Sequence, residues 1–247
     1  KYKPLWTYIA EEKGSDVSVY FYSLSESGYK TKSKTIYDIQ GLHNLCWKNY
    51  YTWNDNHTKF LKKNSKEEFK YFQLGPISFK DSNFENINDI NFKNSIAVFD
   101  AAPYKESFSS VFAMESSKYR TYKNILHFIY DITDICKQMN IDIIYKTKKT
   151  DTNQISKYFL NKIKNVKKEM NFIEISSSVS PKNYIDKCIC SINFPFTSTA
   201  HLSSKTDKSV FYDPTGSLFI DDPSSHGIKV INKKDILKKF IEDVREI

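Results

Sequence analysis

Apolar residues recur at helical spacing in three segments of the second half of the chain, with polar residues on the opposite face. This spacing predicts amphipathic helices over residues 122–139, 155–166 and 234–244. Short runs rich in β-branched and aromatic residues predict strands over residues 95–99, 141–145, 171–175, 188–194, 209–212 and 227–231. Regular alternation of strand and helix is typical of α/β proteins, so we predict a doubly wound, Rossmann-like parallel sheet.

The first part of the chain contains fewer elements. Its pattern predicts two helices and three strands, over residues 4–13, 56–63, 17–22, 49–53 and 70–74. Residues 77–94 are polar and rich in Asn, Asp and Ser, and therefore predict a linker. We divide the chain into a partial N-terminal lobe (1–76), this linker and a Rossmann-like domain (95–247).

One stretch of the second domain carries most of the chemical information. The apolar strand over residues 188–194 runs into Pro-Phe and then into three hydroxyl residues, Thr197, Ser198 and Thr199. We expect a helix over residues 200–205 to follow them. Ligands of parallel α/β sheets bind at the carboxyl ends of strands, and helix N-termini attract anions there. The stretch therefore predicts a phosphate-binding site.

Other candidate residues follow neighbouring strands. Tyr212 and Asp213 end the strand over residues 209–212, Lys146 follows another strand, and Asp100 follows a third. Each candidate also has a structural interpretation. The hydroxyl residues are ordinary helix caps, Tyr212 is a core aromatic, Asp213 forms a turn before a proline, and Lys146 is a solvated lysine. A short helix capped by Ser180 is expected over residues 181–186.

Charge and composition narrow the function. The net charge is +8, but only Arg120 and Arg245 among the 37 basic residues are arginines. Base reading relies on arginine, so we do not expect nucleic acid as a partner. The charge is compatible with weak peripheral contact with an anionic membrane surface. The apolar runs are too short to span a bilayer, which together with the reduced cysteines indicates a cytoplasmic protein.

Metal chemistry is not expected. The cysteines, Cys46, Cys136, Cys188 and Cys190, lack the spacing of a zinc site and are interpreted as reduced, buried thiols. The five histidines are scattered along the chain, and no Asp-x-Asp follows a strand. We therefore expect neither a metal nor a cofactor.

These motifs resemble those of GT-B glycosyltransferases that build bacterial surface polysaccharides such as lipopolysaccharide and capsule. The resemblance covers about residues 53–240. It includes the junction around Gly75-Pro76, the strand over residues 95–99, the Pro-Phe-Thr-Ser-Thr-Ala stretch and the Tyr-Asp-Pro stretch. It implies two Rossmann-like lobes facing across a cleft, with the C-terminal lobe holding a nucleotide-sugar donor.

The resemblance also implies roles for the candidate residues. Thr197, Ser198 and Thr199 would donate hydrogen bonds to the nucleotide phosphate. Lys146 would neutralise phosphate charge and stabilise the leaving group without a metal ion. Tyr212 and Asp213 would line the nucleoside or sugar pocket. CMP-linked donors are favoured and the acceptor is a glycan or lipid-linked glycan, but no catalytic base stands out.

Three alternatives to a glycosyltransferase remain. The chain could be a related enzyme that transfers an alcohol phosphate from a CDP carrier, a non-catalytic interaction module on a Rossmann-like scaffold, or an unrelated α/β protein that binds nucleic acid. Because the first lobe is only partial, we expect this chain to be the C-terminal part of a longer enzyme. Such a part should bind nucleotide but turn over poorly.

Overall fold

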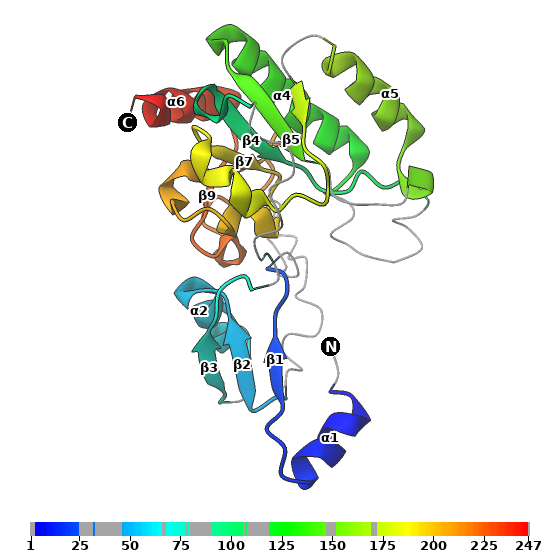
Figure 1. Cartoon of the computed structure of the whole chain (residues 1–247), viewed down its shortest axis with the longest axis vertical. Coiled ribbons are helices and arrows are strands. Elements are labelled where there is room, and N and C mark those ends of the chain that lie inside the picture. Colours follow the sequence, from blue (N-terminus) through cyan, green and yellow to red (C-terminus); the bar gives the residue numbers. More distant parts are fainter. Residues whose placement is uncertain are drawn as a thin grey trace.

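The structure, a computed structural model, describes residues 3–24, 32, 46–65, 68–77, 79, 90–105, 107, 119–146, 152–168 and 172–246. Two regions follow one another along its long axis, a small N-terminal lobe and a larger C-terminal domain (Figure 1). The N-terminal lobe holds a three-stranded sheet and the C-terminal domain a six-stranded sheet. Every paired strand in both sheets is parallel. The predicted α/β architecture with parallel sheets is therefore confirmed, whereas the incompleteness of the first lobe and the domain and linker boundaries stay predictions.

The N-terminal lobe is built on a sheet in the order β1-β2-β3. Asn54 caps its second helix as the sequence indicates, because the Asn54 side chain accepts a hydrogen bond from the His57 N–H at 2.9 Å. The elements of this lobe are α1 (Leu5–Glu12), β1 (Ser18–Tyr20), β2 (Asn49–Thr52), α2 (Asp55–Asn64) and β3 (Lys70–Gln73).

The C-terminal domain is built on a sheet in the order β6-β5-β4-β7-β8-β9. Its long helix is well capped: Thr121 Oγ1 accepts from the Asn124 N–H at 3.2 Å, and Asn140 ends the helix in the left-handed region with a φ of 51°. The elements are β4 (Ser95–Phe99), α4 (Tyr122–Met139), β5 (Asp142–Lys146), α5 (Lys157–Val166), β6 (Phe172–Glu174), β7 (Ser191–Asn193), β8 (Ser209–Tyr212), β9 (Lys229–Ile231) and α6 (Lys234–Arg245).

Alternate residues along a strand of the large sheet point to opposite faces and pack in different hydrophobic cores. In β4, Ile96 and Val98 pack in the core that includes α4, α5 and α6, whereas Ala97 and Phe99 face the opposite side. That opposite side is covered by a segment containing Tyr184 and by residues of the N-terminal lobe. The central strand is fully buried on both faces, as expected for a parallel sheet.

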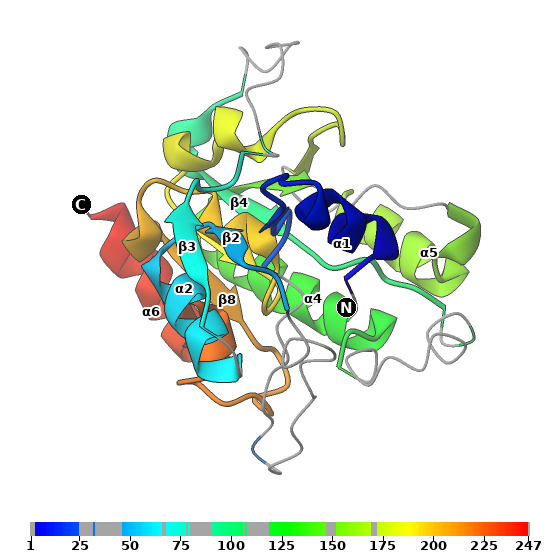
Figure 2. The ribbon, with the colours of Figure 1, turned by 90° about the horizontal axis from the view of Figure 1, so that it is seen from below.

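The two lobes meet through residues that follow the strands of the small sheet. Leu24 lies beyond β1 and Trp53 beyond β2, and both pack in the same core as Phe99 and Leu202 of the large domain. Trp53 Nε1 also donates to the Phe21 carbonyl at 2.5 Å, which orients its ring. Seen from below, the N-terminal lobe lies across the C-terminal domain (Figure 2). The carboxyl ends of the small sheet therefore face the large domain.

Two predicted helices are wrong. Residues 181–186 form two short 3₁₀ turns, η5 (Pro181–Asn183) and η6 (Ile185–Lys187), and the Ser180 side chain caps neither of them. The helix predicted over residues 200–205 is replaced by η7 (Ser198–His201) and η8 (Thr206–Lys208). Helices this short gain too few hydrogen bonds to offset nucleation, so local side-chain contacts decide their conformation. No helix of the described residues is long and apolar enough to cross a membrane.

Candidate functional site

The large sheet has a topological switch point between β4 and β7. The chain adds β5 and β6 on one side of β4, and then adds β7, β8 and β9 on the other side. Connections that leave the carboxyl ends of β4 and β7 diverge, and the crevice between such connections is where doubly wound sheets bind ligands. Asp100 follows β4 at this crevice, and residues 194–199 follow β7. The hydroxyl cluster predicted from the sequence therefore lies at the switch point.

Residues 194–197 form a tight turn directly after β7. The Phe194 carbonyl accepts hydrogen bonds from the Thr197 backbone N–H at 3.3 Å and from Thr197 Oγ1 at 2.9 Å. Phe196 has a φ of 60°, which a bulky side chain rarely adopts. Its ring is 2% exposed and packs on Phe211 with 5.6 Å between centroids, and this burial offsets the strain. Backbone strain held by surrounding packing concentrates at functional sites.

A buried polar network fixes the hydroxyl cluster to the sheet. Thr199 Oγ1 donates to Asn193 Oδ1 at 2.8 Å, and Asn193 Nδ2 donates to Ser191 Oγ at 3.2 Å. Ser209 Oγ on β8 donates to the Ala200 carbonyl at 2.7 Å. These strand residues are buried, so their hydrogen bonds cannot be exchanged for water without a large cost. The network therefore sets the position of the turn.

Ser198 connects the turn to the N-terminal lobe. Its Oγ accepts a hydrogen bond from the Leu24 backbone N–H at 2.9 Å and lies 2.7 Å from Ser23 Oγ. Leu24 is 3% exposed, so this contact lies at the edge of the apolar interface between the lobes. The serine predicted to bind phosphate thus also forms a polar contact between the two lobes.

The change from an α-helix to a 3₁₀ turn alters how an anion could be bound. The expected helix dipole is missing here, because η7 is a single short turn. Within the described part of the chain, the backbone N–H groups of Ser198 and Thr199 have no protein acceptor. Two adjacent N–H groups at such a turn form a small anion-binding concavity. The turn therefore offers backbone N–H groups, rather than a helix N-terminus, at the switch point.

Lys146 lies beside the crevice. It ends β5, the neighbour of β4, and its Nζ donates to the carbonyls of Ser176 at 2.9 Å and Val179 at 2.6 Å. Partial burial lowers the pKa of Lys146 to about 8. Among the described contacts, none joins Lys146 to the hydroxyl cluster. Because an ammonium group has three donors, one donor remains for a ligand.

Asp100 lies directly at the crevice, where β4 ends. Its side chain is buried, and its carboxylate accepts a hydrogen bond from the Tyr145 hydroxyl at 2.5 Å. Burial, with the nearby Asp100 charge, raises the pKa of Tyr145 well above its usual value. Tyr145 therefore stays protonated and holds the Asp100 carboxylate in a fixed orientation.

Tyr212 does not reach the crevice. The structure places its side chain in the helix-covered core, 1% exposed, with its hydroxyl donating to Asp131 on α4 at 2.6 Å. Burial, followed by the Asp131 carboxylate, raises the pKa of Tyr212. Asp131 also lies 3.5 Å from Lys234 Nζ of α6. The expectation of a nucleoside contact is corrected to a core role, because an apolar core covers the ring.

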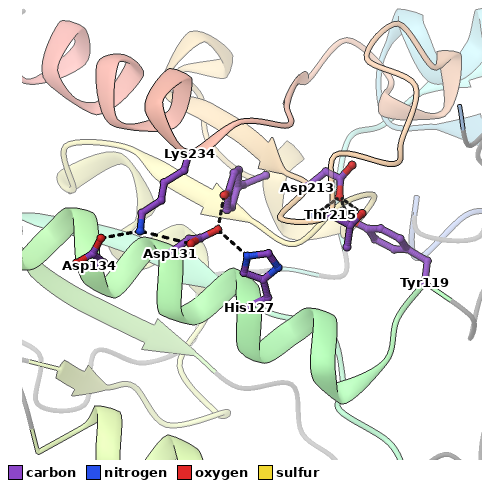
Figure 3. Close-up of polar contacts among 8 residues, drawn as sticks. Tyr119, His127, Asp131, Asp134, Asp213, Thr215 and Lys234 are labelled. Atoms are coloured by element: carbon purple, nitrogen blue, oxygen red, sulfur yellow. Dashed lines mark hydrogen bonds and ion pairs between the residues drawn. The ribbon is translucent and has the colours of Figure 1, made fainter.

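Asp213 is likewise directed inward. It is fully buried, and its Oδ1 accepts from the Tyr119 hydroxyl at 2.8 Å, the Thr215 N–H at 2.9 Å and Thr215 Oγ1 at 2.6 Å (Figure 3). Its Oδ2 accepts from the Leu218 N–H at 2.8 Å. These four donors match the acceptor capacity of a carboxylate. The expected sugar contact is therefore corrected to a turn-forming role in the loop after β8.

Three histidines that are distant in the sequence come together where the lobes meet. The His226 ring lies 5.3 Å from His57 of α2 and 5.9 Å from His201 of η7, measured between centroids. Burial lowers the pKa of His201 to about 3 and that of His226 to about 4. These histidines are scattered along the sequence, and no spacing rule could have joined them. Among the described residues, no group of His, Cys, Asp and Glu side chains could hold a metal ion.

Comparison with protein families gives a match over nearly the whole chain. A family model described as "Polysaccharide biosynthesis PFTS motif protein" matches residues 1–241. The tetrapeptide Pro-Phe-Thr-Ser occurs at residues 195–198, within the strained turn at the switch point. No curated protein matches the chain significantly.

Two solved structures of TarM are similar to this chain. One is an S. aureus TarM mutant in complex with fondaparinux, alpha-GlcNAc-glycerol and UDP, with 8% identity, a TM-score of 0.48 and 93% of this chain covered. The other is a TarM crystal structure with 6% identity, a TM-score of 0.45 and 95% of this chain covered. The chain spans 44% of the length of each TarM chain.

Proposed function

The chain belongs to the family of polysaccharide biosynthesis PFTS motif proteins, and from this premise we propose that it is a glycosyltransferase. It moves a sugar from a nucleotide-sugar donor to a growing bacterial surface glycan. The observation that carries the proposal is the position of the PFTS turn. This turn lies at the switch point of a doubly wound sheet, the ligand-binding crevice of such folds.

The donor phosphate is proposed to bind at the PFTS turn. The backbone N–H groups of Ser198 and Thr199 would meet the phosphate oxygens as negative charge develops on the leaving group. The Thr197 hydroxyl, which donates to the Phe194 carbonyl, would hold the turn in place. A turn held by a buried network needs little reorganisation during the reaction, which favours this role. Lys146 is the proposed second donor-side residue, contributing its remaining N–H and its charge.

The acceptor is proposed to approach from the N-terminal lobe. Leu24 and Trp53 follow the carboxyl ends of β1 and β2, and both contact the large domain near the PFTS turn. The ends of the two parallel sheets therefore face one another. Because Ser198 bonds to Leu24, donor binding at the turn and the position of the N-terminal lobe are proposed to be coupled.

Three expectations from the sequence, on the donor, the leaving group and the location of the reaction, are also part of this proposal. The donor is CMP-linked, the leaving group is stabilised without a metal ion, and the reaction takes place on the cytoplasmic side of the membrane. Asp100 is the described carboxylate closest in the chain to the switch point. Asp100 is proposed to orient the loop after β4 rather than to transfer a proton, because its carboxylate already accepts a hydrogen bond from the Tyr145 hydroxyl.

A nucleotide panel tests this function. Binding of CMP, UDP and GDP to the chain is measured by calorimetry, each with and without EDTA. We expect one nucleotide to bind, CMP most tightly, with an affinity that EDTA does not change. No binding of any nucleotide would contradict the proposal. Binding that EDTA abolishes and Mn²⁺ restores would contradict its metal-independent form.

A further inference from the structure

An open groove lies between the lobes, away from the ends of β4 and β7. One wall is α2 of the N-terminal lobe, and the other is the segment of residues 220–230 that leads into β9. The cavity has a volume of about 430 Å³. Figure 1 shows α2 directly beneath this part of the large domain. The groove is large enough for a ligand of several sugar-sized units.

The wall formed by α2 is a single helical face. Asn56, Lys59, Phe60 and Lys63 line the groove, and their spacing of three, four and seven residues places them on one side of the helix. The two lysines are exposed, one turn apart, with roughly 5–6 Å between their Cβ atoms. This face therefore presents two positive charges, while the Phe60 ring is buried against the protein.

A close backbone contact holds the two walls together. Asn56 Nδ2 donates to the His226 carbonyl at 3.1 Å. At Gly227, whose φ is +92°, a Cβ would lie 2.2 Å from Asn56 Nδ2. Only glycine permits this approach, so the floor of the groove is fixed by backbone geometry.

The charge lining the groove is mainly positive. Lys229 on the second wall adds a third exposed lysine. Within the described ranges, neither Lys59 nor Lys63 forms an ion pair. Asp221 is the exposed acid of the lining, whereas Asp222 is buried and its carboxylate accepts from the Ser224 N–H at 3.0 Å and Ser224 Oγ at 2.5 Å. Three lysines thus face one exposed carboxylate.

We propose that this groove binds an acidic stretch of the glycan, in which carboxylate-bearing sugar units face Lys59, Lys63 and Lys229. Lysines on both walls suit a ligand with repeated charges rather than a single small anion. Ile220, an exposed apolar side chain of the lining, suits the C–H face of a sugar ring. The inference rests on the proposed function in taking the ligand to be the glycan acceptor.

The test uses three probes on the whole chain: tetragalacturonate, neutral maltotetraose and inorganic phosphate, each titrated by calorimetry at low salt. The variant is Lys59→Gln/Lys63→Gln. The matched control is Lys164→Gln/Lys168→Gln, which removes the same charge from two exposed lysines at the end of α5. We expect tetragalacturonate to bind wild type and control equally. We expect the groove variant to bind it about fivefold more weakly or worse, and added salt to weaken binding.

Two results would overturn the inference. The first is equal tetragalacturonate affinity in the groove variant and the control. The second is displacement of tetragalacturonate by an equal concentration of inorganic phosphate, which would show a site for small anions. CMP binding, measured in the same samples, should be unchanged by the groove substitutions. A wild-type chain that binds tetragalacturonate in this groove but no nucleotide contradicts the donor proposal alone, so the two failures are distinguishable.

Discussion

The ends of two adjacent strands, β7 and β8, carry the two motifs that stood out in the sequence, and the structure treats them differently. After β7, the PFTS turn keeps a strained Phe196 and backbone N–H groups at Ser198 and Thr199 that have no acceptor among the residues the structure describes. After β8, Tyr212 and Asp213 are buried and hydrogen-bonded inside the domain. The comparison teaches that similar positions at a sheet edge can serve binding in one strand and architecture in the next.

The physical difference lies in unused hydrogen-bonding capacity. Asp213 receives four donors from its own domain, which leaves nothing for a ligand. The PFTS turn satisfies its side chains internally but leaves backbone donors at the switch point. A substitution after β8 should therefore act on stability, and a substitution after β7 should act on nucleotide affinity.

The largest expected effect is on stability at Asp213. Asp213→Ala removes the acceptor for four donors, so we expect the free energy of unfolding to fall by about 3–5 kcal/mol. Urea unfolding measures the loss, with Asp221→Ala, at an exposed loop position, as the control. CMP affinity per folded molecule should not change. A stable Asp213→Ala protein that has lost CMP binding would contradict this prediction, because it would show that the end of β8 serves nucleotide binding rather than stability.

The next effect is the pH dependence of stability. It involves His201, in the segment that follows β7, and His226, in the segment that follows β8. Both histidines have pKa values lowered by burial, to about 3 and about 4, whereas the unfolded chain titrates near 6.5. Below pH 6.5 the unfolded state binds more protons, so stability falls as pH decreases and levels off only below the folded pKa values. We expect a loss of about 2–4 kcal/mol between pH 7 and pH 5.

Urea unfolding at a series of pH values measures this loss. His226→Asn should reduce the slope, because asparagine tolerates the left-handed backbone at this position and does not titrate. His127→Gln, at an exposed histidine, is the control and should keep the wild-type slope. Equal slopes in all three proteins would show that the buried histidines do not control the pH dependence.

A smaller effect is expected on binding at the PFTS turn. Thr197→Ala/Ser198→Ala should weaken CMP binding by about 1–3 kcal/mol and stability by about 1–2 kcal/mol, because the bonds that hold the turn to the Phe194 carbonyl and to the Leu24 N–H are both lost and the backbone donors are less firmly placed. Calorimetry on the folded double variant measures the affinity. Ser203→Ala, a neighbouring hydroxyl outside the turn that bonds to Asp186, is the control. Unchanged CMP affinity in the double variant would exclude these hydroxyls from the donor site.

The smallest effect is expected at Lys146, which lies beside the crevice. Its pKa of about 8 means that the ammonium loses its charge as pH rises from 7 to 9.5. We expect CMP affinity to fall by about 1 kcal/mol over this range in the wild-type chain. In Lys146→Met, affinity should be lower at pH 7 and should not change with pH. The same pH dependence in both proteins would show that Lys146 only holds the loop after β6 and does not contribute to CMP binding.

The sequence predicted the long elements because their patterns are repeated many times. The 18-residue α4 and the 12-residue α6 each show several turns of one apolar face, and the strands between them follow from β-rich runs. The segment over residues 200–205 has no such repetition. Its conformation is decided by tertiary hydrogen bonds, such as that from Ser209 to Ala200, which the sequence does not display.

The candidate site was only partly predictable for a related reason. The hydroxyl cluster and its place at a strand end could be read from order alone. Whether Asp213 points to a ligand or to Tyr119 depends on a residue 94 positions away. The meeting of His57, His201 and His226 likewise depends on how the two lobes pack.

The central claim is that nucleotide binds at the switch point, and a crystal structure of this chain with the best-bound nucleotide of the panel tests it most directly. The account predicts phosphate oxygens about 3 Å from the backbone N–H groups of Ser198 and Thr199, between the ends of β4 and β7. A nucleotide bound elsewhere, with the PFTS turn uncontacted, would contradict it.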